Sequence, residues 1–290
     1  MPKSQQEVTI RTARAEDSAV CGQICYDAFA KLSAKHNFPS DVPDAQTAIG
    51  IMSALFSSPG FYCVVAESDG RIVGSNCLDE RSLIGGIGPI TVEPGAQNGG
   101  AGRKLMRVVM DRARERQPAG MRLVQAAYHN RSLALYTSLG FDVREPLSCM
   151  QGRPLERNVP GCVVRPAQTC DLEACNAMSR RVHGFDRGAE LAEGIQRKTA
   201  CVVERAGCIT GYATVLAFFG HATAESNLDL QALIASAESF GGPGILVPSR
   251  NSALLRWCIG NGLKVVQPMT LMSIGLYNEP AGAWLPSVLF

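Results

Sequence analysis

The sequence predicts an α/β fold that is built twice along one chain of 290 residues. Strand-like and helix-like segments alternate in both halves of the chain. Several features of the first half also recur in the same order in the second half, which is the signature of a duplication. The length is sufficient for two domains of ordinary size.

The composition is that of a globular protein without a strong overall charge. Hydrophobic residues make up 46% of the chain, charged residues 19%, and the formal net charge is +2. This small charge gives no whole-protein attraction to nucleic acid or to membranes, so we expect neither as a partner. No apolar run is long enough to span a membrane, and residues 1–17 lack the apolar core of a signal peptide. We therefore expect a cytoplasmic protein.

The eleven cysteines stand singly along the chain, and none forms a C-x-x-C pair. Such a pattern favours small core residues in a reducing compartment over a disulfide framework. The four histidines are also scattered, so we expect no metal site. They are His36, His129, His183 and His221.

Local patterns predict the elements of the first half in order. Asp17 is expected to cap the first helix, and the turn Ser68-Asp69-Gly70 separates the two strands of a hairpin. Glycines at 85, 86 and 88 indicate a bulge or a close backbone approach inside one strand. The expected strands are 8–11, 61–67, 71–78, 84–92, 121–128 and one after residue 141, and the expected helices are 18–30, 45–56, 103–116 and 132–139.

One stretch of the first half combines a strand, a glycine-rich turn and a basic helix. The strand ends at Ile90-Thr91-Val92, the turn holds Gly99, Gly100 and Gly102, and the helix carries six basic residues against two acidic ones. Backbone N–H groups and the partial positive charge of a helix start suit phosphate groups. Alternatively, the glycine-rich turn is only a tight connection between the strand and the helix and binds no ligand. The turn matches neither the nucleoside-triphosphate loop nor the dinucleotide pattern.

The second half repeats the framework but not the glycine-rich turn. A helix is expected near Asn227, capped by Ser226 or Asn227, and this half should not hold a pyrophosphate in the same way. We interpret His221 as a hydrogen-bonded histidine, with a cleft-lining role as the alternative. The matching pairs of segments are Arg11 to Asp17 with Arg165 to Asp171, 63–67 with 201–204, 70–74 with 207–211, and 130–140 with 251–262.

The pattern Gln97-x-x-Gly100-x-Gly102 resembles the coenzyme A signature of the GNAT acyltransferase superfamily. The strand before it, of the ITVEP type, and the later Tyr136, Gly140 and Phe141 fit the same family. The resemblance implies a mixed, mostly antiparallel central sheet flanked by helices, duplicated in this chain. It implies a catalytic acyl-CoA-binding domain at 1–150, a linker at 151–162 and a degenerate GNAT-like domain with a C-terminal tail at 163–290.

The resemblance also assigns roles to individual residues. Backbone groups of Thr91 and Val92 would pair with the pantetheine arm, and the Val92 amide would polarise the thioester carbonyl. Tyr136 would protonate the leaving thiolate. The family's Asn contact falls on His129 when counted back from Tyr136, and Asn130 stands one residue late. The implied cofactor-binding residues are Ile90, Thr91, Val92, Gln97, Asn98, Gly99, Gly100, Ala101, Gly102, Arg103 and Asn130.

The implied reaction is acetyl transfer from acetyl-CoA, as co-substrate, to a primary amine by direct attack in a ternary complex, without a metal. The acceptor is a small molecule or a protein or peptide amine, and a homodimer is left open. A non-catalytic coenzyme A-binding module and O-acyl transfer, or a longer acyl donor, are the alternatives. The general base is also open. Asp79, Glu80 and Glu93 are interpreted as turn residues, and His36 or water could take the proton.

Overall fold

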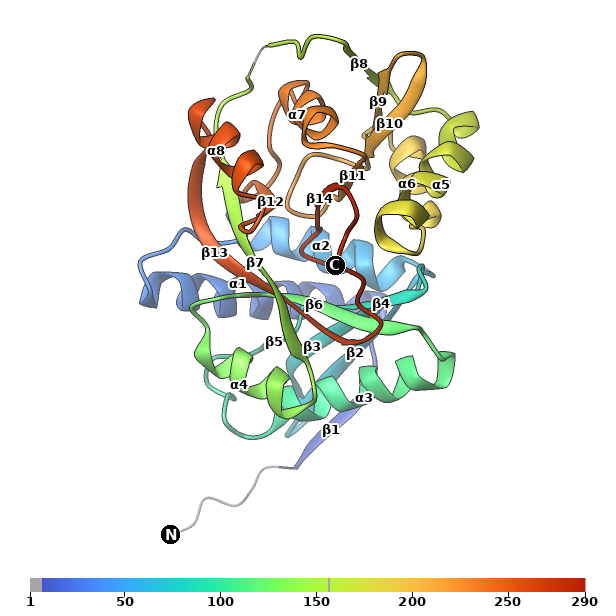
Figure 1. Cartoon of the computed structure of the whole chain (residues 1–290). Helices are drawn as coiled ribbons and strands as arrows, with labels where there is room; N and C mark the ends of the chain where they lie inside the picture. The colour runs from blue at the N-terminus through green and yellow to red at the C-terminus, as the bar shows by residue number, and fades with distance from the viewer. Residues whose placement is uncertain (1–6, 156, 290) are drawn as a thin grey trace. The chain divides into compact units, whose positions relative to one another are not determined.

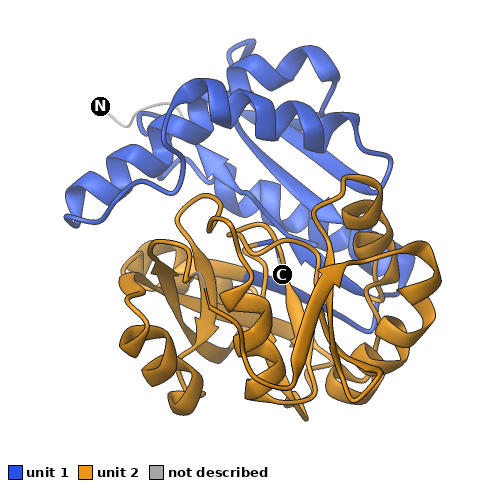
Figure 2. Ribbon diagram, turned by 90° about the horizontal axis from the view of Figure 1, so that it is seen from above, with its two compact units in different colours: residues 1–80, 84–123, 289 blue, residues 81–83, 124–288, 290 orange. Residues whose placement is uncertain are grey.

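The computed structural model describes residues 7–155 and 157–289 (Figure 1). Helices flank mostly antiparallel sheets, which confirms the predicted α/β class and the duplicated framework. The described chain divides into two compact units (Figure 2). Unit 1 contains residues up to 80, 84–123 and 289, and unit 2 contains 81–83 and 124–288.

Unit 1 is a sheet with helices on both faces. Strands β1, β2, β3 and β4 pair antiparallel in that order, and β4 pairs parallel with the start of β6. The elements that lie in unit 1 are β1 (Val8–Thr12), α1 (Ser18–Lys35), α2 (Ala45–Ser57), β2 (Phe61–Ser68), β3 (Arg71–Asp79), β4 (Ile84–Ile87), β5 (Thr91–Val92), α3 (Ala101–Arg116) and the start of β6 (Gly120–Ala126).

Burial on both sheet faces explains the apolar run of β2. Cys63 and Val65 pack with residues of α1 and α2 on one face. On the other face the neighbouring strand β3 contacts α3, where the Asn76 side chain reaches the sulfur of Met106 at 3.6 Å. A strand covered on both faces needs a nearly continuous apolar sequence rather than strict alternation.

Unit 2 holds two antiparallel sheets. One joins β13, β7 and β12, and the other has the order β14-β11-β10-β9-β8. Its core is formed by three apolar clusters around these sheets. Its remaining elements are α4 (Asn130–Ser138), β7 (Asp142–Gln151), β8 (Cys162–Pro166), α5 (Leu172–His183), α6 (Gly188–Gln196), β9 (Cys201–Arg205), β10 (Cys208–Ala213), β11 (Ala222–Ala224), α7 (Asn227–Ala235), β12 (Ile245–Pro248), α8 (Ser252–Gly260), β13 (Lys264–Gly275) and β14 (Ala283–Leu285).

The duplication extends to individual hydrogen bonds. Arg11 donates to both carboxylate oxygens of Asp17, at 2.7 and 2.9 Å, and to Glu67 at 2.8 Å. Arg165 makes the corresponding bonds to Asp171 at 2.7 and 2.9 Å, and its Nε donates to Glu204 at 2.8 Å. In both halves, therefore, a buried carboxylate ties the first strand to the short 3₁₀ turn that precedes the first helix. The predicted domain boundaries at 151 and 162 stay a prediction. Strand β7, from the first predicted domain, pairs with β13, from the second.

The predicted helix cap at Asp17 is wrong. The Asp17 carboxylate accepts from the Arg14 amide at 2.8 Å and from Arg11, so it closes a short 3₁₀ turn, and its side chain bonds no amide of α1. Helix α1 also runs to Lys35, five residues past the expected end. The apolar spacing of 18–30 gave no signal for the polar last turn.

Seven of the eleven cysteines are buried, and all eleven are free thiols. In unit 1, Cys21, Cys63 and Cys77 belong to one apolar cluster. Burial raises the pKa of the Cys21 thiol to about 12, so this group stays protonated and packs as a small apolar side chain.

Candidate functional site

The strand predicted at 84–92 is interrupted by a bulge. Ile87 lies opposite Leu78 and Thr91 lies opposite Ser75, so four steps on this strand face three on β3. The extra residue falls in Gly88-Pro89-Ile90, where the Gly88–Pro89 peptide is cis. A bulge bends a strand and changes where its backbone groups point. The strand glycines did predict this irregularity.

The bulge leaves the backbone of Val92 facing away from β3. The Glu93 amide donates to the Val73 carbonyl at 2.8 Å, which makes Glu93 and Val73 a hydrogen-bonded pair. Alternation along an antiparallel ladder then turns the N–H and C=O groups of Val92 to the opposite edge. Gln97 donates its side-chain amide to the Val92 carbonyl at 3.1 Å. Gln97 of the signature thus fixes the strand end, and the Val92 N–H points outward.

The turn after β5 leads directly into α3, and no side chain caps the start of this helix. Gly100 is the N-cap residue, with a left-handed φ of 86°, and a Cβ built on it would meet nothing within 4 Å. Asn98 also has a positive φ, 73°. The Lys104 amide bonds to the Gly100 carbonyl at 3.1 Å, so the amides before it lie outside the helical ladder. No acidic residue stands in the first turn. This helix start suits an anion.

Tyr136 lies on α4 in unit 2 and is 6% exposed. Its ring makes an edge contact with Phe141, with centroids 6.3 Å apart. Its hydroxyl has no hydrogen-bond partner within the part of the chain that the structure describes. Burial raises the pKa of the Tyr136 phenol above its ordinary value. The phenol is therefore neutral near neutral pH.

The start of α4 places the two candidates for the Asn contact next to each other. His129 is the N-cap residue and Asn130 is the first, exposed, helical residue. The second half places Asn251 at the same point of α8, where its side chain accepts from the Leu254 amide at 3.2 Å. After α4 the Phe141 amide donates to the Tyr136 carbonyl, and after α8 the Leu263 amide donates to the Cys258 carbonyl. These matching bonds align Tyr136 with Cys258. The second half therefore lacks the phenol.

Comparison with known proteins agrees with this geometry. Residues 27–141 match the model of the acetyltransferase (GNAT) family. This stretch of the chain is therefore similar to the GNAT family. Among curated proteins none matches this chain.

Solved structures extend the similarity to both halves. A putative acetyltransferase from Pyrococcus horikoshii is 19% identical, with a TM-score of 0.73 over 95% of this chain and 94% of that one. A GCN5-related N-acetyltransferase from Sphaerobacter thermophilus is 15% identical, with a TM-score of 0.63 over 96% and 98%. A tandem GNAT protein from the clavulanic acid biosynthesis pathway is 14% identical, with a TM-score of 0.55 over 93% and 98%. The whole chain thus has a tandem GNAT fold.

Two residues at the end of β3 are not the surface turn residues that the sequence predicted. Asp79 is 6% exposed, and Glu80 accepts from Arg112 at 2.9 Å and pairs with Arg116 at 3.5 Å. The pairing comes from α3, more than thirty residues away, so local pattern could not reveal it. Two guanidinium groups hold Glu80 as a structural anion. Glu93 meets the prediction of a solvated turn residue, with Arg71 at 3.5 Å.

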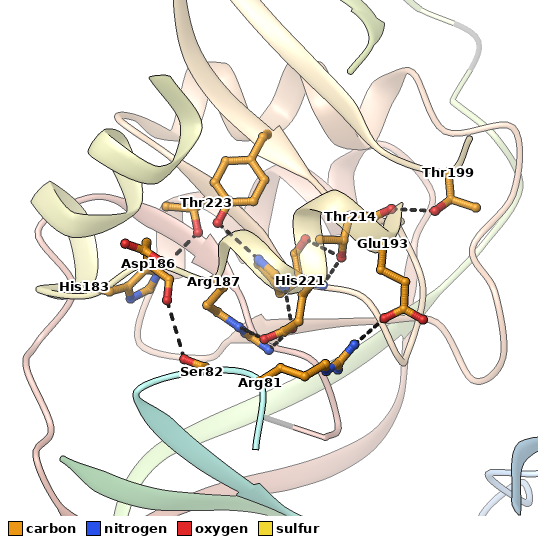
Figure 3. Close-up of polar contacts among 12 residues, drawn as sticks. Arg81, Ser82, His183, Asp186, Arg187, Glu193, Thr199, Thr214, His221 and Thr223 are labelled. Atoms are coloured by element: carbon orange, nitrogen blue, oxygen red, sulfur yellow. Dashed lines mark hydrogen bonds and ion pairs between the residues drawn. The ribbon is translucent and has the colours of Figure 1, made fainter. Parts of the chain in front are cut away.

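Unit 2 contains a buried polar network that sequence reasoning missed (Figure 3). Arg187 donates to both oxygens of Glu190, at 2.8 and 2.5 Å. His221 Nδ1 lies 3.3 Å from Glu190, and its Nε2 lies 3.2 Å from the Tyr212 hydroxyl. His221 is therefore hydrogen-bonded on both nitrogens, which confirms the interpretation of a satisfied histidine. The only local indication of this network was the i, i+3 spacing of Arg187 and Glu190, which suits an ion pair on a helix.

This network makes the stability of the protein depend on pH. Burial, with the charge of Arg187, lowers the pKa of His221 to about 4, against 6.5 for the free side chain. Below pH 6.5 the unfolded state binds a proton that the folded state excludes. We expect the unfolding free energy to fall by about 3 kcal/mol between pH 6.5 and 4.

Melting temperatures measured between pH 7.5 and 4.5 test this prediction. His221→Asn should lower the melting temperature at neutral pH and flatten the dependence below pH 6.5. Glu190 strengthens the same trend at lower pH. Burial alone would raise its pKa, but Arg187 and His221 lower it. An equal slope in the two proteins would contradict the assignment.

Within residues 7–155 and 157–289 no group of three or more His, Cys, Asp and Glu side chains is placed to hold a metal ion. In the same ranges none of the helices combines the length and the apolar character needed to cross a membrane.

Proposed function

We propose that the chain transfers an acyl group, in the first instance acetyl, from acetyl-CoA to a primary amine. The outward-facing Val92 amide beside a helix start capped by glycine is the observation that carries this proposal. The acceptor amine belongs to a small molecule or to a protein or peptide. The similarity of residues 27–141 to the GNAT family supports the transferase class.

The donor's phosphates would lie against the amides from Asn98 to Arg103. The absence of a side chain at Gly100, and of any acid in the first turn of α3, supports this role. The pantetheine arm would lie along the open edge of β5, beside the outward-facing Val92 N–H, like an added strand. The Val92 N–H would then donate to the thioester carbonyl oxygen and stabilise the negative charge that develops there.

Direct attack needs a neutral amine and a proton for the leaving thiolate. Tyr136 would donate its hydroxyl proton in a hydrogen bond to that sulfur. A thiol has a pKa of about 8.5, well below that of the buried phenol, so complete proton transfer from Tyr136 is uphill. We therefore propose that Tyr136 stabilises the thiolate as a hydrogen-bond donor. The amine loses its own proton to water or to a base of the acceptor site.

Two measurements test the proposal. Millimolar acetyl-CoA should raise the melting temperature, because a ligand at about 100 times its Kd adds about 2.7 kcal/mol to the unfolding free energy. A panel of small amines and amine-bearing peptides should then release free coenzyme A thiol. Stabilisation without thiol release from any amine would favour a binding module. The absence of stabilisation would reject the donor site.

A further inference from the structure

The C-terminal strand β14 pairs antiparallel with β11 in unit 2, with Ala283 opposite Ala224 and Leu285 opposite Ala222. We propose that β14 occupies, in the second half, the place that the pantetheine arm of the donor takes in the first half. The chain's own tail thereby closes this half to acyl donors and leaves one donor site per chain. The inference rests on the proposed function of the first half.

The two halves align residue by residue at this strand. Gly74 lies opposite Val92 and Ser75 opposite Thr91 in the first half. Gly211 lies opposite Ala224 and Tyr212 opposite Thr223 in the second half. The next pair is hydrogen-bonded in both, from Glu93 to Val73 at 2.8 Å and from Glu225 to Thr210 at 2.9 Å. Ala224 is therefore the counterpart of Val92, and Thr223 is the counterpart of Thr91.

The same alternation turns the backbone groups of Ala224 away from β10, just as it turns those of Val92 away from β3. In the first half, the described residues give β5 no strand partner other than β3. In the second half, the outward edge of β11 is paired with β14. The amide that corresponds to the donor-binding Val92 amide is thus already used by Ala283.

The phosphate cradle is also missing from the second half. Seven residues lie between Glu93 and the first position of α3, Ala101, whereas only Ser226 lies between Glu225 and Asn227 of α7. Asp229 in the first turn of α7 is fully buried. Burial would raise the pKa of Asp229, but its bonds to Arg205, Ser226 and Thr210 keep it below the ordinary value. A carboxylate at this helix start repels phosphate.

The tail is anchored on both sides of β14. The Ala281 amide donates to the Val182 carbonyl at 2.9 Å, and the Val288 amide donates to the Phe218 carbonyl at 2.8 Å. His183 lies 3.3 Å from the Thr223 hydroxyl (Figure 3), and its ring meets Trp284 edge to face. The residues of β14 are 7% exposed or less. A strand held in this way is a fixed part of the second half.

Hydrogen exchange of the unaltered chain tests the inference. Without ligand, the Ala224 amide should already be protected and the Val92 amide should exchange at least about tenfold faster. Acetyl-CoA should bind as one equivalent, slow exchange at Val92 and leave 222–224 unchanged. A second equivalent, or slowing at 222–224, would overturn the closure. Rapid exchange of Ala224 without ligand would do the same. An unchanged Val92 together with a protected Ala224 would reject only the first-half donor site.

A matched pair of tail variants tests the pairing of β14 with β11. Ala283→Pro removes the N–H that faces β11, and Ala283→Gly keeps it. The proline variant should speed exchange at Ala224 by at least about tenfold, while the Kd for acetyl-CoA changes less than about twofold. The glycine variant should retain protection. A fall in donor affinity in the proline variant alone would contradict the separation of the two sites. If the proline variant does not fold, the exchange pattern of the unaltered chain decides.

Discussion

Gly100→Glu is expected to abolish stabilisation by acetyl-CoA. The substitution places a carboxylate at the start of α3, where the donor's phosphates would meet the uncapped amides. Like charges brought together in a binding site cost several kcal/mol, and a loss of about 3 kcal/mol raises the Kd about 100-fold. At a concentration of acetyl-CoA that saturates the unaltered protein, the rise in melting temperature should therefore largely disappear.

Two control variants separate the charge from the strain. Gly100 has a φ of 86°, so any side chain there is strained, and Gly100→Ala measures this effect without adding a charge. Gly260→Glu adds the same charge at an exposed position of α8, where a Cβ would meet nothing within 4 Å. Both controls should retain most of the stabilisation by acetyl-CoA. A Gly100→Glu protein that binds as tightly as Gly100→Ala would place the phosphates elsewhere.

The features that the sequence could predict are those determined by residues close together in the chain. The hairpin turn at Asp69 and Gly70 follows from residues that tolerate positive φ. The bulge near Gly88 could be predicted because glycine inside a strand often marks a bulge or a close backbone approach. The expected strand 61–67 matches β2 to within one residue, because a compact apolar run bounded by turn residues leaves few alternatives.

The missed features all depend on partners that are distant in sequence. β14 follows Pro280 and Gly282, which indicate a loop, and its strand character comes from pairing with β11 about sixty residues earlier. Glu80 looks like a turn residue, and only its ion pair with Arg112 of α3 shows otherwise. Glu190 was overlooked because a carboxylate is expected on the surface, and only Arg187 and His221 make its burial tolerable. Tertiary contacts overrule local preference at each of these places.

Tyr136→Phe is expected to lower turnover far more than donor binding. The change removes one oxygen from a buried ring and keeps its edge contact with Phe141. Because the hydroxyl has no hydrogen-bond partner among the described residues, its loss should leave the folded state nearly unperturbed. Removal of one hydrogen-bond donor to a developing anion typically lowers a rate by about 100-fold to 1,000-fold.

Thiol release with a reactive amine, compared with the Kd for acetyl-CoA, measures the two effects separately. A kcat reduced at least about 100-fold with a Kd changed less than about twofold would identify a group that acts on the leaving sulfur. Equal turnover of the two proteins would reject that role. A donor with a better leaving group offers a finer test. If Tyr136 stabilises the departing thiolate, an acyl donor with a more acidic thiol should recover part of the lost rate, because its sulfur needs less stabilisation. A purely structural role for Tyr136 would give the same loss with both donors.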